Sequence, residues 1–342
     1  MKTTPSLLLL GICLLPLFSS CEKDYYDAYV SHTVKVRSSS YSGVPYPAEF
    51  EKQANLVIMG DGYTTEDLMG GGAFETAANS LVSHLLSTPP YTHYGYYYLN
   101  VWYVYMASPE RGVGHGSPKN SAFRCYFHET YPETIVFEDV NFIGMRKAAD
   151  PFDVAKQAVP GINMDNTLVV VLVNDSQVGY TTGWSTQNYH SWISIISTCP
   201  EPNFERLVLR EVGGKGFARL AQEDGDQYGP ALEQLVLIKE GYNQYGFFAN
   251  VDVTDNPGDP TSVRWSHFLS YPAKFPELGI FMGGFGYYSG VYHPDQDNVM
   301  LKNGSLRYDA PSREAIIKRF YQIWGDTYSM GTFIYHFVDG SF

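Results

Sequence analysis

An uninterrupted apolar run, from Leu168 to Val173, constrains the fold of this chain most strongly. The run reads Leu-Val-Val-Val-Leu-Val, and it is rich in the β-branched residues that favour strands. Because no polar residue alternates with the apolar ones, both faces of such a strand must be covered. The run therefore predicts a central strand of a sheet that has a packed layer on each side, as in α/β proteins.

The spacing of apolar residues elsewhere completes this picture. Further strands are expected over residues 56–59, 99–106 and 194–198, and helical spacing is found over 74–85, 204–212, 232–239 and 316–324. The glycine-rich stretch from Gly283 to Gly290 contains no lysine, so it is expected to be a surface or cleft-lining loop rather than a phosphate-binding loop. We therefore expect an α/β fold in which helices flank a mixed central sheet.

The N-terminal residues indicate export. Lys2 precedes an apolar run over residues 7–18, which is too short to span a membrane comfortably, so residues 1–20 are predicted to be a signal peptide. Residues 17–21 resemble the cleavage box of bacterial lipoproteins, which implies that Cys21 becomes a lipidated N-terminus. An ordinary signal peptide followed by a chance cysteine is the alternative. We expect a tether over residues 21–49, one domain over 50–342, and a lipid-anchored protein exposed on the outer membrane.

The charge balance narrows the range of partners. The chain has 36 acidic and 23 basic residues, a formal net charge of −13, which argues against nucleic-acid binding because phosphate contacts need clustered cations. Cys125 and Cys199 are the cysteines left after the predicted lipidation, and their spacing does not decide whether they form a disulfide. The 28 tyrosines could serve packing or stacking on sugars.

One segment bears directly on catalysis. Residues 208–223 read VLREVGGKGFARLAQE. A zinc-peptidase helix carries two histidines one turn apart, which hold the metal, and a glutamate beside the first, which deprotonates the metal-bound water. Glu211 is in the position of that glutamate, whereas both histidines are missing.

With this segment, the chain resembles the IgA-peptidase-like family of secreted zinc metallopeptidases, in its Bacteroides lipoprotein branch. The family pattern G-D-G-Y/F-T matches residues 60–64, and its active helix reads close to H-E-x-G-G-H-G-F-G-K-L-x-D-E. Further matches in the same order are at residues 87–91, 97–101, 246–252, 290–294 and 310–313. The resemblance covers nearly the whole mature chain, and it implies a zincin-like metallopeptidase domain.

The resemblance also implies which residues occupy the former metal site. Arg210 and Lys215 stand where the two histidine ligands are expected, and Gln222 stands where an acidic residue is expected to complete the site. If the second ligand is counted four residues after the first, the position is Gly214, which has no side chain. Glu211 is retained at the position of the general base, and we expect it to be non-functional.

Three more residues are candidates for supporting positions in the cleft: Glu223, Asp61 and His293. For Asp61, which follows a predicted strand, a role in a turn or cap is the alternative.

Electrostatics argues against zinc at these positions. A guanidinium has no lone pair to offer, and a lysine must lose its proton before it can bind a metal. A divalent ion about 4 Å from one such cation would be repelled by about 8 kcal/mol at an effective dielectric of about 20, against the ~10–16 kcal/mol that a structural zinc site supplies. We therefore expect no cofactor, with Arg210 and Lys215 filling the vacated space and pairing with Glu211 and Glu223.

These observations predict a catalytically inactive pseudopeptidase that binds a peptide, a glycoprotein or an outer-membrane partner. Two alternatives stay open: an active metallo-endopeptidase that holds its metal through other residues, and a carbohydrate-binding surface lipoprotein. The glycine pair at residues 213–214 is expected to end or distort the helix, since two glycines cost about 2 kcal/mol relative to alanine in a helix interior.

Overall fold

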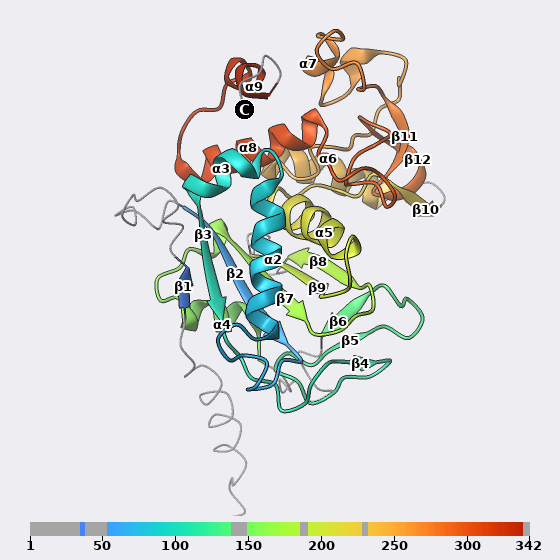
Figure 1. Ribbon diagram of the computed structural model, residues 1–342. Helices are drawn as coiled ribbons and strands as arrows, with labels where there is room; N and C mark the ends of the chain where they lie inside the picture. The colour runs from blue at the N-terminus through green and yellow to red at the C-terminus, as the bar shows by residue number, and fades with distance from the viewer. Residues whose placement is uncertain (1–34, 38–52, 138–148, 185–190, 228–231, 338–342) are drawn as a thin grey trace, which may run out of the picture.

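The computed structural model describes residues 35–37, 53–137, 149–184, 191–227 and 232–337 (Figure 1). The predicted signal peptide, Cys21 and most of the predicted tether lie outside the described residues. Within the described part of the chain, no helix combines the length and the apolar character needed to cross a membrane.

A six-stranded sheet forms the centre of the fold, in the order β1-β3-β2-β7-β9-β8. Its strands are β1 (Lys35–Arg37), β2 (Ala54–Asp61), β3 (Leu99–Val104), β7 (Thr167–Val173), β8 (Tyr180–Trp184) and β9 (Trp192–Ser197). The four inner strands are parallel, whereas β1 and β8 pair antiparallel at the two edges. The sheet is therefore mixed, as predicted.

Strand β7 is buried on both faces, which confirms the interpretation of its apolar run. Leu168, Val170 and Leu172 belong to one hydrophobic core, and Val169 and Val171 belong to a second core on the opposite face. The first core joins residues from Ala54 to Phe333, so the C-terminal third of the chain packs into the same interior as the first strands.

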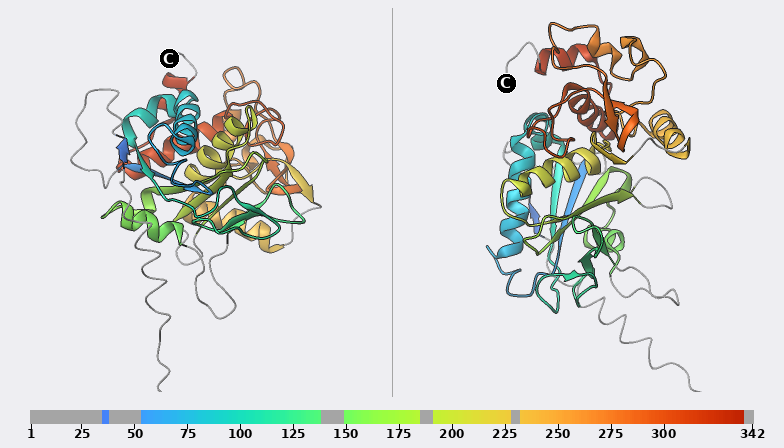
Figure 2. Two further views of the ribbon diagram at one scale, coloured as in Figure 1. Left: turned by 60° about the horizontal axis from the view of Figure 1, so that its bottom comes forward. Right: turned by 90° about the vertical axis from the view of Figure 1, so that its right-hand side faces the viewer.

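Helices cover both faces of the sheet. The first core contains residues of α2 (Ala73–Ser87), α3 (Tyr91–Tyr98), α5 (Asn203–Leu207), η3 (Val208–Phe217) and α8 (Ala310–Trp324). The second core contains residues of α4 (Pro151–Ala158). In the right-hand view of Figure 2, α2 and α4 lie on opposite sides of the sheet. The α/β fold with flanking helices is thus confirmed.

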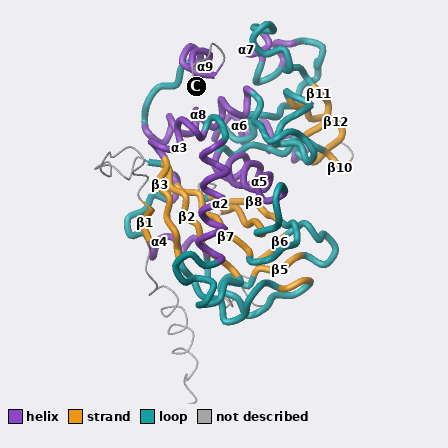
Figure 3. Tube along the Cα trace, in the orientation of Figure 1, coloured by secondary structure: helices purple, strands orange, loops and turns teal. Residues whose placement is uncertain are grey.

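Two small sheets extend this layered unit. One consists of β4 (Gly114–His115), β5 (Cys125–Phe127) and β6 (Ile135–Phe137), and Figure 3 shows long loops around it. The other consists of β10 (Gly225–Gln227), β11 (Phe281–Gly284) and β12 (Gly286–His293). The glycine-rich stretch predicted as a loop therefore forms an antiparallel hairpin, so that prediction is wrong. Glycines at 283, 284 and 286 have φ of +119°, +134° and +85°, which reflects the tight connection between its strands.

The remaining elements lie mainly in the C-terminal part, at the top of Figure 1. They are η2 (Met164–Asn166), α6 (Leu232–Tyr245), η4 (Pro260–Ser262), α7 (Ser266–Leu269) and α9 (Met330–Phe337). Cys125 and Cys199 are both buried and free, so they form no disulfide with each other.

The helix that carries Glu211 does not end at the glycine pair. Helix α5 continues directly into η3, a π-helix that extends through both glycines to Phe217. The glycine pair therefore does not end the helix, but the helix is distorted from α-helical to π-helical geometry around it. The widened turns are held from outside, because the Tyr91 hydroxyl donates a 2.7 Å hydrogen bond to the carbonyl of Gly213. A Cβ atom at Gly213 would lie 2.3 Å from the Tyr308 hydroxyl oxygen, and one at Gly214 would lie 2.5 Å from Met300 Sδ.

Tight packing around Gly213 leads to a first prediction. We expect Gly213→Ala to destabilise the protein by about 1–3 kcal/mol, because the new methyl group overpacks against Tyr308 and Tyr91. Gly183→Ala is the matched control, since a Cβ at Gly183 meets no heavy atom within 4 Å. Urea unfolding of both variants measures the difference, and equal stability of the two would contradict this account of the helix.

Candidate functional site

The π-helix brings together residues that an α-helix would separate. Arg210 and Lys215 are five residues apart, and the π-helix pairs backbone groups at that spacing, whereas an α-helix aligns residues three or four apart. Both side chains reach the same carboxylate oxygen, Oε1 of Glu211, which is adjacent to Arg210 in the sequence and four residues before Lys215. Gly214 has no side chain to contribute to this cluster.

Glu211 is fully buried, and one cation and two hydroxyl groups lie close to it. Lys215 Nζ lies 2.9 Å from its Oε1, and Thr182 donates a 2.9 Å hydrogen bond from its hydroxyl to Oε2. The Ser194 hydroxyl donates to the backbone carbonyl of Glu211 at 2.7 Å. Strands β8 and β9 thus fix this residue through Thr182 and Ser194. Burial lowers the pKa of Lys215, and the Glu211 carboxylate acts in the opposite direction.

Arg210 is the second cation beside this carboxylate. It is buried, with Nε 3.6 Å from Glu211 Oε1 and one terminal nitrogen 3.4 Å from Asp224 Oδ1. The ring of Tyr180 lies beneath both cations, 5.6 Å from the Arg210 guanidinium carbon and 5.3 Å from Lys215 Nζ. Asp224 and Tyr180 were not among the sequence candidates. No motif pointed to Tyr180, whereas Asp224 directly follows the two acidic positions of the pattern.

Gln222 adjoins the same cluster. Its Oε1 is 3.5 Å from Lys215 Nζ, so the three positions expected to hold metal ligands, Arg210, Lys215 and Gln222, are indeed brought together around Glu211. Their donor set does not suit zinc, since two members are cations and the third is an amide. Among the described residues, moreover, no group of three or more His, Cys, Asp or Glu side chains is arranged to hold a metal ion.

Glu223 lies in a separate buried cluster. Its carboxylate accepts hydrogen bonds from Asn250 Nδ2 at 2.8 Å and Asn298 Nδ2 at 2.6 Å. Burial raises the pKa of Glu223 to about 8, and the hydrogen bonds from the two amides act in the opposite direction. The expected pairing of Glu223 with Arg210 or Lys215 is therefore wrong, because amide donors already bind this carboxylate.

The two other cleft candidates have different positions. His293 lies in the Glu223 cluster, with Nδ1 3.3 Å from Glu223 Oε2 and 2.9 Å from the carbonyl oxygen of Asp295. Asp61 is fully buried at the end of β2, where its carboxylate accepts hydrogen bonds from the backbone nitrogens of Phe123 and Cys125. Asp61 thus anchors the segment that leads into β5, a contact with a distant part of the chain that the sequence did not indicate.

An aromatic pocket opens beside Lys215 and Gln222. It has a volume of about 260 Å³, and Trp184, Trp192, Phe248 and Phe285 contribute rings to its wall, together with Thr182, Leu220 and Ala221. We refer to it below as the aromatic pocket. Its polar groups are on the side of the Glu211 cluster, so a ligand in this pocket would contact Lys215 and Gln222.

Comparison with known families identifies the fold around this cluster. The family model described as IgA peptidase M64 matches residues 48–243, which is more than half of the chain. The chain belongs to the IgA peptidase M64 family. No curated protein matches the chain. The matched region contains the central sheet from β2 onward and the whole α5–η3 helix, so the Arg210–Glu211–Lys215 cluster lies within the M64 region.

The buried ion pair of this M64 site leads to a second prediction. We expect Lys215→Met to destabilise the protein by about 3–5 kcal/mol, because it leaves the Glu211 carboxylate buried without its closest cation. Adding Glu211→Gln removes the uncompensated charge, so the double variant loses less stability than the sum of the single variants. Urea unfolding of the four proteins measures this coupling.

An exposed pair provides the control. Lys302 and Glu133 are also 2.9 Å apart, but both side chains are about half exposed. Lys302→Met is expected to cost less than about 1 kcal/mol, since surface ion pairs contribute little. A cost for Lys215→Met as small as that of Lys302→Met would show that the Glu211 carboxylate is not held as described.

Proposed function

We propose that this protein is a pseudopeptidase: a surface lipoprotein that keeps the M64 fold, holds no zinc at the former active helix, and binds a peptide or glycoprotein. The observation that carries this proposal is the ion pair between Lys215 Nζ and Glu211 Oε1, at 2.9 Å and inside the protein. A lysine ammonium stands where the family pattern has a metal ligand, and it neutralises the carboxylate that would act as general base.

The state of Glu211 supports the absence of peptidase chemistry. A general base must be within hydrogen-bond reach of the proton that it removes. Both carboxylate oxygens of Glu211 are instead engaged by Lys215 and Thr182, and the residue has no exposed surface. A substrate water therefore has no access to this carboxylate in the observed arrangement.

The aromatic pocket supports binding as the retained activity. Ligand pockets are mostly apolar with a few placed polar groups, and here four aromatic rings adjoin one ammonium and one amide. An aromatic or aliphatic side chain of a peptide fits such a wall, with Lys215 and Gln222 available to its backbone carbonyl groups. A sugar is the second candidate ligand, because the faces of Trp184 and Trp192 suit stacking on a pyranose ring.

Zinc binding tests the proposal. We expect the purified protein to contain no stoichiometric zinc and to cleave no peptide when zinc is added. The variant Arg210→His, Lys215→His, Gln222→Asp is expected to gain zinc affinity, because it places two imidazoles on the π-helix beside Glu211 and a carboxylate at residue 222, which contacts residue 215. Metal analysis and zinc titration of both proteins, followed by a peptidase assay, measure the outcome.

A matched variant guards against non-specific zinc uptake. Substituting His at two exposed positions outside the cluster, Lys156 on α4 and Lys239 on α6, adds the same number of imidazoles without a common face. Chelator-sensitive proteolysis by the parent protein with near-stoichiometric zinc would overturn the proposal in favour of an active metallo-endopeptidase. A triple variant that folds normally but binds zinc no better than the parent would show that residues 210, 215 and 222 do not mark a former metal site.

The membrane anchor is a separate part of the proposal and rests on the sequence alone. Cys21 follows the apolar run and small residues of a lipoprotein signal, and lasting attachment needs more than one acyl chain. We expect Cys21→Ala to release the protein from membranes, and Cys13→Ala, within the predicted signal peptide, to leave fractionation unchanged. Membrane retention of the Cys21→Ala protein equal to that of the parent would contradict lipid anchoring.

A further inference from the structure

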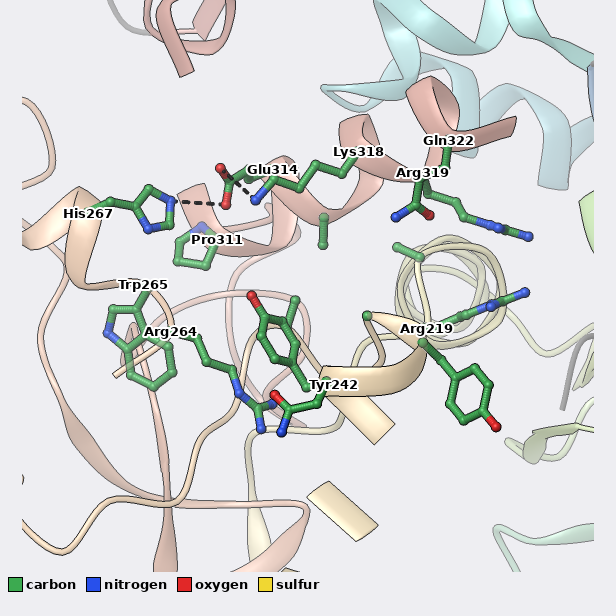
Figure 4. Close-up of a pocket in the computed structure, with 16 residues that line it drawn as sticks. Arg219, Tyr242, Arg264, Trp265, His267, Pro311, Glu314, Lys318, Arg319 and Gln322 are labelled. Atoms are coloured by element: carbon green, nitrogen blue, oxygen red, sulfur yellow. Dashed lines mark hydrogen bonds and ion pairs between the residues drawn. The ribbon is translucent and has the colours of Figure 1, made fainter. Parts of the chain in front are cut away.

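A second pocket lies between α8 and the end of α6, and nothing in the proposed function uses it. Its volume of about 350 Å³ is within the ~300–1,000 Å³ that is typical of small-molecule sites. Figure 4 shows Glu314, Lys318 and Gln322 along α8, across the pocket from Tyr242 and Arg264. We refer to it as the α8 pocket. It shares no lining residue with the aromatic pocket or the Glu211 cluster, so it is a separate site.

One face of α8 forms a wall of this pocket. The helix is fixed at its start, where the Asp309 carboxylate accepts a 2.7 Å hydrogen bond from the backbone nitrogen of Ser312. Its lining residues recur at the spacing of one helix face: Pro311, Glu314, Ala315, Lys318, Arg319 and Gln322. A regular helix therefore holds these side chains in place, which makes a more precise site than a loop.

The charged groups of this wall are paired within the protein. Lys318 Nζ lies 3.1 Å from Glu314 Oε1, and His267 Nε2 lies 3.1 Å from Glu314 Oε2, as the dashed lines in Figure 4 mark. The Tyr328 hydroxyl also donates a 2.8 Å hydrogen bond to Glu314 Oε1. Glu314 is thus held in a fixed position, and its charge already has partners.

The arginines of the pocket are engaged as well. Arg264 Nε lies 3.3 Å from Asp252 Oδ1. Arg319 donates a hydrogen bond to the carbonyl oxygen of Asp165, and the negative charge of Asp165 acts on both Arg319 and Arg219. A charged ligand would therefore lose its hydration in this pocket without meeting an unused counter-charge, which is unfavourable.

Uncharged polar groups are available to a ligand instead. Asn243 and Gln322 line the pocket and are exposed, and neither side chain makes a hydrogen bond with another described residue. An amide group both donates and accepts hydrogen bonds, as a ligand hydroxyl group does. The paired carboxylate of Glu314 keeps further acceptor capacity, because each carboxylate oxygen accepts more than one hydrogen bond. The wall is therefore suited to a neutral ligand that carries several hydroxyl groups.

Tyr245 adds a flat apolar surface at the end of α6. Its ring stacks on Phe247 with a centroid distance of 5.1 Å and an interplanar angle of 27°, yet the residue is 39% exposed. One face of the ring is covered by Phe247, so the opposite face is accessible. Several of the other apolar residues of the wall are small: Ala218, Ala249, Ala315 and Pro311. The pocket thus offers one aromatic face rather than the continuous apolar enclosure that a lipid chain needs.

We propose that the α8 pocket binds a neutral saccharide, with one sugar ring packed on Tyr245 and its hydroxyl groups bound by Asn243 and Gln322. A pyranose ring has an apolar C–H face and a rim of hydroxyl groups, which matches an aromatic face beside amide groups. An ion lacks the counter-charge that it needs here, and an apolar chain lacks the enclosure. The proposal does not depend on the pseudopeptidase assignment, because the two sites have no residue in common.

Titration calorimetry with free sugars tests this site. The probes are the neutral disaccharides maltose, cellobiose, lactose and N,N′-diacetylchitobiose, added to the full mature protein, and sodium phosphate is the charged probe at matched ionic strength. We expect binding of at least one disaccharide and none of phosphate. An array of neutral glycans then shows which sugar and linkage the pocket prefers.

Substitutions locate the binding. Tyr245→Ala is expected to raise the Kd for the disaccharide at least about tenfold, whereas Tyr245→Phe keeps the ring face and most of the affinity. Gln322→Ala is expected to raise the Kd about threefold to tenfold, because it removes an amide partner. Tyr271→Ala is the matched control and is expected to leave the Kd unchanged, since Tyr271 is 46% exposed and lies outside the pocket.

Three results would overturn the proposal. The first is a parent protein that binds no neutral disaccharide and no glycan of the array, and the second is a protein that binds phosphate in preference to the sugars. The third is sugar binding that survives both Tyr245→Ala and Gln322→Ala but is lost in Trp184→Ala, which would assign it to the aromatic pocket. If Tyr245→Ala does not fold, Gln322→Ala decides, because it changes an exposed residue of a helix to the best helix former.

Discussion

A buried carboxylate is the constraint on which the centre of this structure depends. Glu211 has no exposed surface, and a charge in that position is tolerated only when it is paired and hydrogen-bonded. Lys215 supplies the charge, while Thr182 and Ser194 hold the carboxylate and the backbone carbonyl from β8 and β9. The same contacts therefore fix the helix to the sheet and engage both oxygens of the carboxylate.

The helix that carries this pair is wound more widely than an α-helix. Arg210 and Lys215 reach one oxygen across five residues, a spacing that π-helical hydrogen bonding brings onto one face. Glycines at 213 and 214 permit the wide turns, since side chains there would collide with Tyr308 and Met300. Propensity alone argues that two glycines break a helix, but packing around them outweighs their conformational cost.

Local sequence patterns predicted the strands, helices and helix motif that depend on the spacing of nearby residues. The apolar run of β7 and the helical spacing of α2 and α8 identified the layers, and the helix motif identified Arg210, Glu211 and Lys215 as neighbours. The contacts that the sequence did not predict are those between segments far apart in the chain. The partners of Glu223 are Asn250 and Asn298, 27 and 75 residues away, and no spacing rule connects them. The β11–β12 hairpin was missed for another reason, because its glycines hide the alternation of a strand.

Trp192 connects the aromatic pocket to the segment that follows η3. Its ring forms part of the wall of that pocket, and the guanidinium carbon of Arg219 lies 5.4 Å from the ring centroid. Closely packed interiors transmit displacement, so a shift of Arg219 would alter the packing of that ring. The residues that follow η3 thus help to shape one wall of the aromatic pocket, although they lie outside the Glu211 cluster.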